Sequence, residues 1–237
     1  MKYFTKRSAA GKRLIRISVC LVLFLLFFTI TGFKLLTRGS VLVHATMDIP
    51  ASEPVFFQQE DPSWAKDTLG ASGYTMESSG CLTTCLATVL SMQSVPAGPF
   101  AESPDPGLLN QYFSENSIYD AEGNIQWEPL EVFLGCDIIR LQGDGLRSLP
   151  PLQTYTDNAV SDTENGQNLS EFMESLLSSN IFPIVRVRMG GFCSYHYVTV
   201  VGSQDGNFLC MDPLGDGKTL TPLSRFGNRV YAVRFLV

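Results

Sequence analysis

Three side chains in this sequence have the types and the order that nucleophilic catalysis by a thiol requires. Cys81 begins a helix-like run, His196 lies in a strand-like run, and Asp212 ends the next strand-like run. An adjacent imidazole activates a thiol, and a carboxylate orients that imidazole and stabilises its charged form. Downstream of residue 45 the chain has a single histidine, so the candidate base has no competitor there.

The position of Cys81 at a helix start favours its thiolate, because N-terminal N–H groups and the helix dipole stabilise negative charge. The alternative is a small buried apolar side chain, which is a common role for cysteine. Cys85 lies one turn further on the same helix face, where the dipole contributes little, and we expect it to pack in the core.

A metal site is the weaker alternative for the same thiols. Its ligands would be Cys81, Cys85, Cys193 and His196. Two ligands inside one helix, without a glycine-rich knuckle, are unusual for zinc. We therefore expect no metal and no other cofactor.

The strands that carry His196 and Asp212 must be paired so that both side chains lie on one face. Residues 204–206 read Gln-Asp-Gly, the sequence of a three-residue hairpin loop whose glycine adopts the left-handed conformation. That loop makes His196 the diagonal same-face neighbour of Asp212, at about 7–8 Å between backbones. A two-residue loop would place the two groups on opposite faces, so the mechanism requires the three-residue loop or a bulge.

Helix-like patterns precede strand-like patterns in residues 55–237, which predicts an α+β domain with an antiparallel sheet. Asn168, with Glu171 three residues later, has the pattern of a helix N-cap. Residues 143–166 are polar and rich in turn-forming residues, which predicts a long surface loop. The expected helices cover 81–92, 108–116, 127–134 and 169–178, and the expected strands cover 137–141, 183–189, 195–203, 207–212 and 230–237.

The N-terminal region contains an uncharged apolar run, residues 17–33, preceded by six basic residues. At about 1.5 Å per residue this run nearly spans a hydrocarbon core of roughly 30 Å. The positive flank predicts an N-terminus in the cytoplasm and a C-terminal domain outside the cell. We expect a cytoplasmic basic tail at 1–16, a transmembrane signal-anchor at 17–36, a tether at 37–54 and the catalytic domain at 55–237.

A cleaved signal peptide is the alternative to a retained anchor. Val43-His44-Ala45 resembles a small-residue cleavage site, and cleavage there would release a secreted domain. The site lies 12 residues beyond Phe33, however, with Lys34 and Arg38 between them. That separation favours the anchor.

Charge is divided unevenly along the chain. Residues 1–38 hold 8 of the 17 basic residues and no acidic residue, which leaves 9 basic and 23 acidic residues downstream, a formal balance of 9 − 23 = −14. An acidic exterior domain argues against nucleic acid as a partner, and solubility is a sufficient reason for the charge. Five cysteines follow the apolar run, so at least one thiol has no intramolecular disulfide partner.

Four sequence blocks resemble the bacteriocin-leader (double-glycine) peptidase-like family of papain-type cysteine peptidases, in particular its stand-alone bacterial branch. The blocks are Gln59-x-Asp61-x-x-Trp64-Ala65, Ser79-Gly80-Cys81, His196-Tyr197-Val198-Thr199-Val200-Val201-Gly202 and Asp212-Pro213. The resemblance extends over roughly residues 55–237. Family members often follow the nucleophile with Gly-Pro, whereas this chain has Leu82-Thr83.

The resemblance implies a papain-like fold with Cys81 as nucleophile, His196 as general base and Asp212 as the group that orients it. It also implies Gln59, rather than Gln58, as the side-chain donor to the oxyanion, a role that a glutamine amide can fill.

The expected function is that of a membrane-anchored, extracytoplasmic cysteine hydrolase that cleaves a peptide or cell-wall peptide through an acyl-enzyme. Two alternatives remain open. One is a catalytically inactive papain-like binding module, and the other is a cell-wall amidase or acyltransferase that uses the same three side chains. The sequence does not name the substrate.

Overall fold

The computed structural model describes residues 9–51, 53–93, 99–100, 102–156, 166–190 and 194–237. The chain divides into two compact units between Arg38 and Gly39. Of the expected basic tail at 1–16, residues 1–8 lie outside the described residues and residues 9–16 belong to the first helix.

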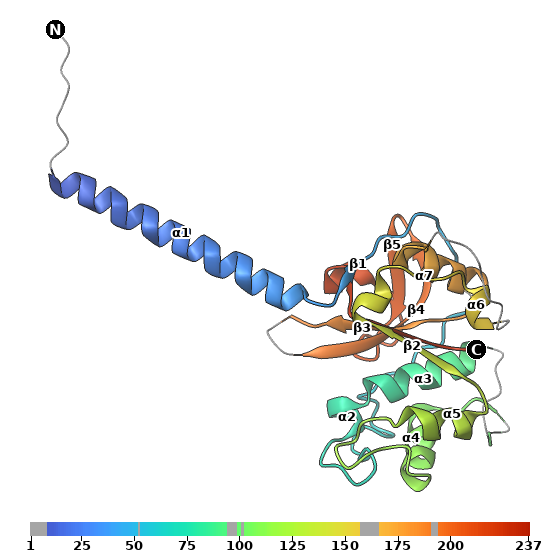
Figure 1. Cartoon of the computed structure of the whole chain (residues 1–237). Helices are drawn as coiled ribbons and strands as arrows, with labels where there is room; N and C mark the ends of the chain where they lie inside the picture. The colour runs from blue at the N-terminus through green and yellow to red at the C-terminus, as the bar shows by residue number, and fades with distance from the viewer. Residues whose placement is uncertain (1–8, 52, 94–98, 101, 157–165, 191–193) are drawn as a thin grey trace. The chain divides into compact units, whose positions relative to one another are not determined.

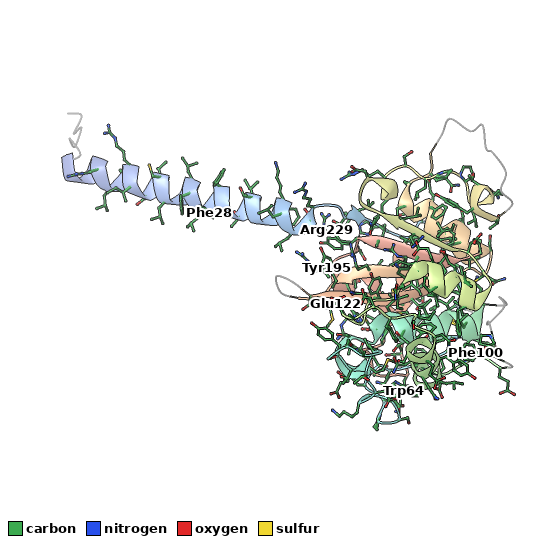
Figure 2. The ribbon with its side chains drawn as sticks, turned by 60° about the horizontal axis from the view of Figure 1, so that its bottom comes forward. Phe28, Trp64, Phe100, Glu122, Tyr195 and Arg229 are labelled. Carbon is green, nitrogen blue, oxygen red and sulfur yellow. The ribbon has the colours of Figure 1, made fainter. Side chains whose placement is uncertain are left out.

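The first unit contains one long helix, α1 (Ala9–Thr37). Its segment Arg13–Thr37 has a mean hydropathy of 2.5 and is long and apolar enough to cross a membrane or to serve as a signal sequence. Its large apolar side chains, such as Phe28, project outward from the helix (Figure 2). The predicted span at 17–36 lies within this helix.

The second unit is built on a six-stranded antiparallel sheet in the order β2-β8-β3-β4-β5-β6, with a two-stranded sheet, β1-β7, beside it. The prediction of an α+β domain with an antiparallel sheet is therefore confirmed. The strands are β1 (Val41–Leu42), β2 (Ile138–Gln142), β3 (Ile184–Arg188), β4 (Tyr195–Gln204), β5 (Asn207–Met211), β6 (Thr221–Pro222), β7 (Arg229–Val230) and β8 (Ala232–Leu236).

Helices lie on both sides of the large sheet, with α3, α4 and α5 on one side and α7 on the other (Figure 1). The capping residues agree with the sequence, since the Asn168 side chain accepts a hydrogen bond from the Glu171 N–H at the start of α7. The helices of this unit are α2 (Met76–Ser79), α3 (Cys81–Met92), α4 (Pro106–Glu115), α5 (Trp127–Leu134), α6 (Gln153–Thr156) and α7 (Leu169–Ser178), with short 3-10 turns at Gly143–Leu146 and Leu223–Phe226.

Helix α3 occupies the centre of the domain, because residues 83–90 are all buried. It lies against β4, where the Thr199 hydroxyl donates to the Cys85 carbonyl at 3.5 Å. A helix buried on nearly every side cannot shift without disrupting the packed core. The position of its first residue is thereby fixed relative to the strands.

The hairpin between β4 and β5 differs from the expected one. Gln204 pairs with Asn207, so the loop has two residues, and both have positive φ angles (50° at Asp205 and 77° at Gly206). Asp-Gly is a preferred sequence for such a turn, because positive φ costs these residues little. The predicted three-residue loop is wrong.

A bulge compensates for the shorter loop. The register shifts between Val200 and Gly202, and beyond the shift Thr199 pairs with Met211. Continued by one residue, this register sets Val198 opposite Asp212, as the longer loop would have done. The bulge thus returns His196 and Asp212 to one face, which is the second of the two arrangements that the mechanism allowed.

Residues 40–51 form part of the domain and not the free tether that the sequence predicts. Strand β1 pairs with β7, Ile49 forms a bridge with Ser203, and Val43 is 1% exposed. Gly202 allows this segment to pass closely, because a Cβ there would lie 2.7 Å from the Ile49 carbonyl oxygen. The second unit therefore begins at Gly39, about 16 residues before the expected boundary at 55.

The described part of the predicted loop at 143–166, residues 143–156 and Gly166, contains more regular structure than its composition predicts. It contains a 3-10 turn and α6, and three of its leucines are buried: Leu146, Leu149 and Leu152. Residues 157–165 lie outside the described residues. Spaced leucines within a polar segment indicate an irregular stretch that contributes to the core.

Candidate active site

Cys81 is the first residue of α3, and a tight connection from α2 through Gly80 sets its position. Gly80 has ordinary backbone angles, but a Cβ there would lie 2.5 Å from the Met76 carbonyl oxygen and 2.8 Å from its Cα. Close approach of two backbones, not a left-handed conformation, therefore requires glycine before the cysteine. As the first residue of the helix, Cys81 has a backbone N–H without a partner inside α3.

His196 and Asp212 form a buried pair. The imidazole Nε2 lies 2.7 Å from Asp212 Oδ1, with His196 2% exposed and Asp212 7% exposed. The Leu214 N–H donates to the same carboxylate oxygen at 2.9 Å, which fixes the carboxylate from the turn that follows β5. The Phe226 ring lies 6.1 Å from the imidazole ring, centroid to centroid.

This pair changes the charge state of the imidazole. Burial opposes the imidazolium, but the hydrogen bond to Asp212 and the interaction with the nearby Cys81 side chain outweigh it and raise the pKa of His196 to about 9. Burial likewise opposes the Asp212 carboxylate. The bonds from His196 and Leu214 nevertheless hold the pKa of that carboxyl below its usual value. The raised pKa of His196 favours the imidazolium at neutral pH, hydrogen-bonded to the Asp212 carboxylate.

The other described cysteines of the domain lie in environments that favour the protonated thiol. Burial raises the pKa of the Cys85 thiol well above its ordinary value and raises that of Cys210 as well. Burial raises the pKa of Cys136 to about 11. These thiols stay protonated at neutral pH, as expected for Cys85 as a packing residue. Cys193 lies outside the described residues.

Gln59 is buried, and its backbone and side chain bond to the segments that carry Asp212 and Cys81. Its N–H donates to the Pro213 carbonyl at 3.0 Å, directly after Asp212, and its Nε2 donates to the Glu77 carbonyl at 2.8 Å, one turn before Cys81. An amide nitrogen carries two hydrogens, so the second remains for another acceptor. The neighbouring Gln58 is tied elsewhere, since its Nε2 donates to the Gly215 carbonyl at 2.7 Å.

A pocket of about 540 Å³ opens beside the thiol. Aromatic and charged side chains from α5, β4 and β8 line it together with Cys81, which is partly exposed, whereas His196 is not part of the lining. Its lining residues include Cys81, Tyr119, Glu122, Trp127, Tyr197 and Arg234.

Sequence reasoning selected the thiol, the imidazole and the carboxylate but missed the walls of the pocket. The sequence could have identified Arg234 as a candidate functional residue, because it is the one charged residue in an otherwise apolar run, Val230–Val237. Trp127 gave no such signal, since an aromatic residue at the start of a short helix is usually a packing residue.

No family model matches the chain, and no curated protein matches it. Among solved structures, the chain is similar to the crystal structure of a candidate C39-like peptidase from Bacillus anthracis. The alignment has 12% sequence identity and a TM-score of 0.44, and it covers 80% of this chain and 97% of that one.

Proposed function

We propose that the second unit is a cysteine hydrolase that cleaves peptide or amide bonds through an acyl-enzyme. The observation that supports this most directly is the buried His196–Asp212 hydrogen bond, with the Cys81 side chain at the start of a helix near enough to raise the pKa of the same imidazole. An imidazole that is oriented by a carboxylate and placed near a thiol can activate that thiol as a nucleophile.

In the proposed reaction the Cys81 thiolate attacks the carbonyl carbon of the substrate and forms a carbon–sulfur bond. The carbonyl oxygen becomes an oxyanion, which the Cys81 backbone N–H and the second Nε2 hydrogen of Gln59 stabilise. The His196 imidazolium then donates its proton to the leaving nitrogen, the carbon–nitrogen bond breaks, and the amine departs from a thioester.

Hydrolysis of the thioester completes the cycle. The neutral imidazole takes a proton from water, the resulting hydroxide attacks the thioester, and the acid product leaves as the Cys81 sulfur departs. Because Nε2 is bonded to Asp212, Nδ1 is the nitrogen that exchanges protons in both steps. Asp212 keeps its charge throughout and stabilises the imidazolium.

Selective labelling tests this proposal. Iodoacetamide at pH 7 is expected to alkylate Cys81 in the full-length protein, and Cys81→Ala is expected to abolish that modification, because the remaining described thiols of the domain stay protonated. Peptide mass spectrometry locates the modified cysteine. Cys85→Ala is the matched control and should label as the wild type does. Unchanged labelling of Cys81→Ala, or loss of labelling in Cys85→Ala, would contradict the assignment.

We further propose that α1 is retained as a membrane anchor, with its basic end in the cytoplasm. The support comes from the segment after the helix. Val43 is 1% exposed and Ala45 9% exposed, and the N–H groups of both donate to carbonyls of the domain. Cleavage after Ala45 would remove β1 and the buried Val43 side chain, which costs about 1.5–3 kcal/mol of apolar burial.

Retention of the anchor predicts the size of the mature protein. The protein extracted from membranes is expected to have the intact mass of the uncleaved chain. Cells that express Ala45→Glu, a change that blocks a small-residue cleavage site, serve as the comparison. A wild-type protein that begins at Thr46 and is found in the medium, while the variant stays in the membrane, would overturn the anchor.

A further inference from the structure

Arg234 is a buried cation in the wall of the pocket that Cys81 lines. It is 6% exposed, although arginine is rarely buried without a partner of opposite charge. None of the ion pairs among the described residues includes it. Burying an uncompensated charge is expensive, so the domain carries a destabilising group beside its nucleophile.

The bonds of Arg234 hold its guanidinium in place without neutralising it. Nη1 donates to the carbonyls of Leu141 at 3.1 Å and Val233 at 2.9 Å, and Nη2 lies 3.5 Å from the Gln142 amide oxygen. The Nε–H is buried and has no hydrogen-bond partner. The guanidinium is thus oriented by neutral groups and keeps an unused donor.

The surroundings of Arg234 add positive charge. Burial lowers the pKa of Arg234, the neighbouring Tyr197 raises it, and the nearby Arg186 and Arg140 lower it further. Of these neighbours, Arg140 is paired with Glu128 at 3.3 Å, on the solvent side. Among the described residues that line the pocket, Glu122 is the only one with a carboxylate, and it lies exposed, where water screens its charge.

Aromatic rings complete the environment. The guanidinium carbon of Arg234 lies 5.4 Å from the centre of the Trp127 ring, a cation–π contact that helps to hold the guanidinium in place. Tyr197 lines the same pocket from β4, next to His196. A buried guanidinium that is held in one orientation attracts a carboxylate strongly, because the low dielectric around it strengthens a charge-assisted hydrogen bond.

We propose that the pocket binds a carboxylate of the substrate through Arg234, so that the preferred substrates carry a negative charge close to the bond that Cys81 attacks. This inference rests on the proposed hydrolase function for its biological meaning. The carboxylate can come from an acidic side chain or from the C-terminus of a peptide, and both present the same group to the arginine.

Two alkylating reagents measure this preference without requiring hydrolysis. Iodoacetate and iodoacetamide deliver nearly the same group to Cys81, but only the first is an anion. The ratio of their alkylation rates at Cys81 in full-length protein is expected to fall about tenfold in Arg234→Gln, the change that loss of one charge-assisted hydrogen bond produces. Arg147→Gln removes an exposed arginine outside the pocket and should leave the ratio unchanged.

An equal decrease in both rates, or an equal ratio in Arg234→Gln and Arg147→Gln, would overturn the proposal. Wild-type protein gives an independent measurement if Arg234→Gln does not fold. Glutarate is then expected to slow alkylation of Cys81 by iodoacetamide in a saturable manner, while neutral glutaramide does not. Equal effects of the two compounds would also overturn it.

Peptide hydrolysis then distinguishes the two sources of the carboxylate. One peptide series ends in a free carboxylate, and the other is amidated at its end but contains glutamate beside each candidate bond. Faster hydrolysis of either series, relative to its carboxamide counterpart, supports the anion site and names its source. An anion-selective Cys81 that hydrolyses neither series would retain the binding site and reject the hydrolase function.

Discussion

His196→Gln is expected to lower kcat/KM by roughly 10³-fold, within the range that general acid–base catalysis contributes. Glutamine can still donate a hydrogen bond to Asp212, so the buried carboxylate keeps a partner and the fold is retained. It cannot take up or release a proton at neutral pH. Hydrolysis of a mixed fluorogenic peptide library by full-length protein measures the activity, and circular dichroism checks the fold.

His44→Gln is the matched control for this variant. His44 is the other histidine of the chain, lies exposed, and contacts the Asn228 side-chain amide through Nδ1 at 3.2 Å. We expect wild-type activity from it. Thiol labelling should separate the two variants in the same way. Alkylation of Cys81 is expected to be slower in His196→Gln, which has lost the imidazolium near the sulfur, and unchanged in His44→Gln. Activity of His196→Gln within twofold of wild type would remove the imidazole from the mechanism.

The stability of the domain is expected to decrease between about pH 6.5 and pH 9. The folded state raises the pKa of His196 from 6.5 to about 9, so it binds this proton more tightly than the unfolded state does. The stabilisation is fully present below the unfolded value and disappears as the pH rises through the folded value. The difference in pKa corresponds to about 3 kcal/mol of the free energy of unfolding.

Urea unfolding of wild type and His196→Gln at pH 6.0, 7.5 and 9.5 measures this contribution. The expected result is a difference in the free energy of unfolding that is largest at pH 6.0 and smallest at pH 9.5. A difference that does not vary with pH would mean that the proton is not held by the folded state. In the wild type, kcat should fall above about pH 9 for the same reason, because the leaving nitrogen then lacks its proton donor.

The local elements could be predicted well from the sequence. The helices Cys81–Met92, Trp127–Leu134 and Leu169–Ser178 match their expected ranges, because short-range features such as apolar spacing and the Asn168 cap decide them. The two strands of the hairpin, β4 and β5, were also located, because runs of β-branched residues bounded by turn residues are local signals.

The contacts between distant segments could not be predicted from the sequence in this way. Residues 40–51 have the composition of a linker, yet they pair with β7 and with Ser203, more than 150 positions away. A bulge at residues 200–202 replaced the extra loop residue that the hairpin was expected to have. Both outcomes depend on which backbone groups find partners after the chain has folded, and such partners leave no local pattern.

The sequence alone determined which atoms could react: one thiol at a helix start, one histidine and one aspartate in the right order along the chain. Only the tertiary structure decided that imidazole and carboxylate meet at 2.7 Å and that Arg234 stands uncompensated in the wall beside the thiol. The physical reason is that residue type fixes chemical capacity, whereas distance, burial and counter-charge arise from packing between segments far apart in the chain.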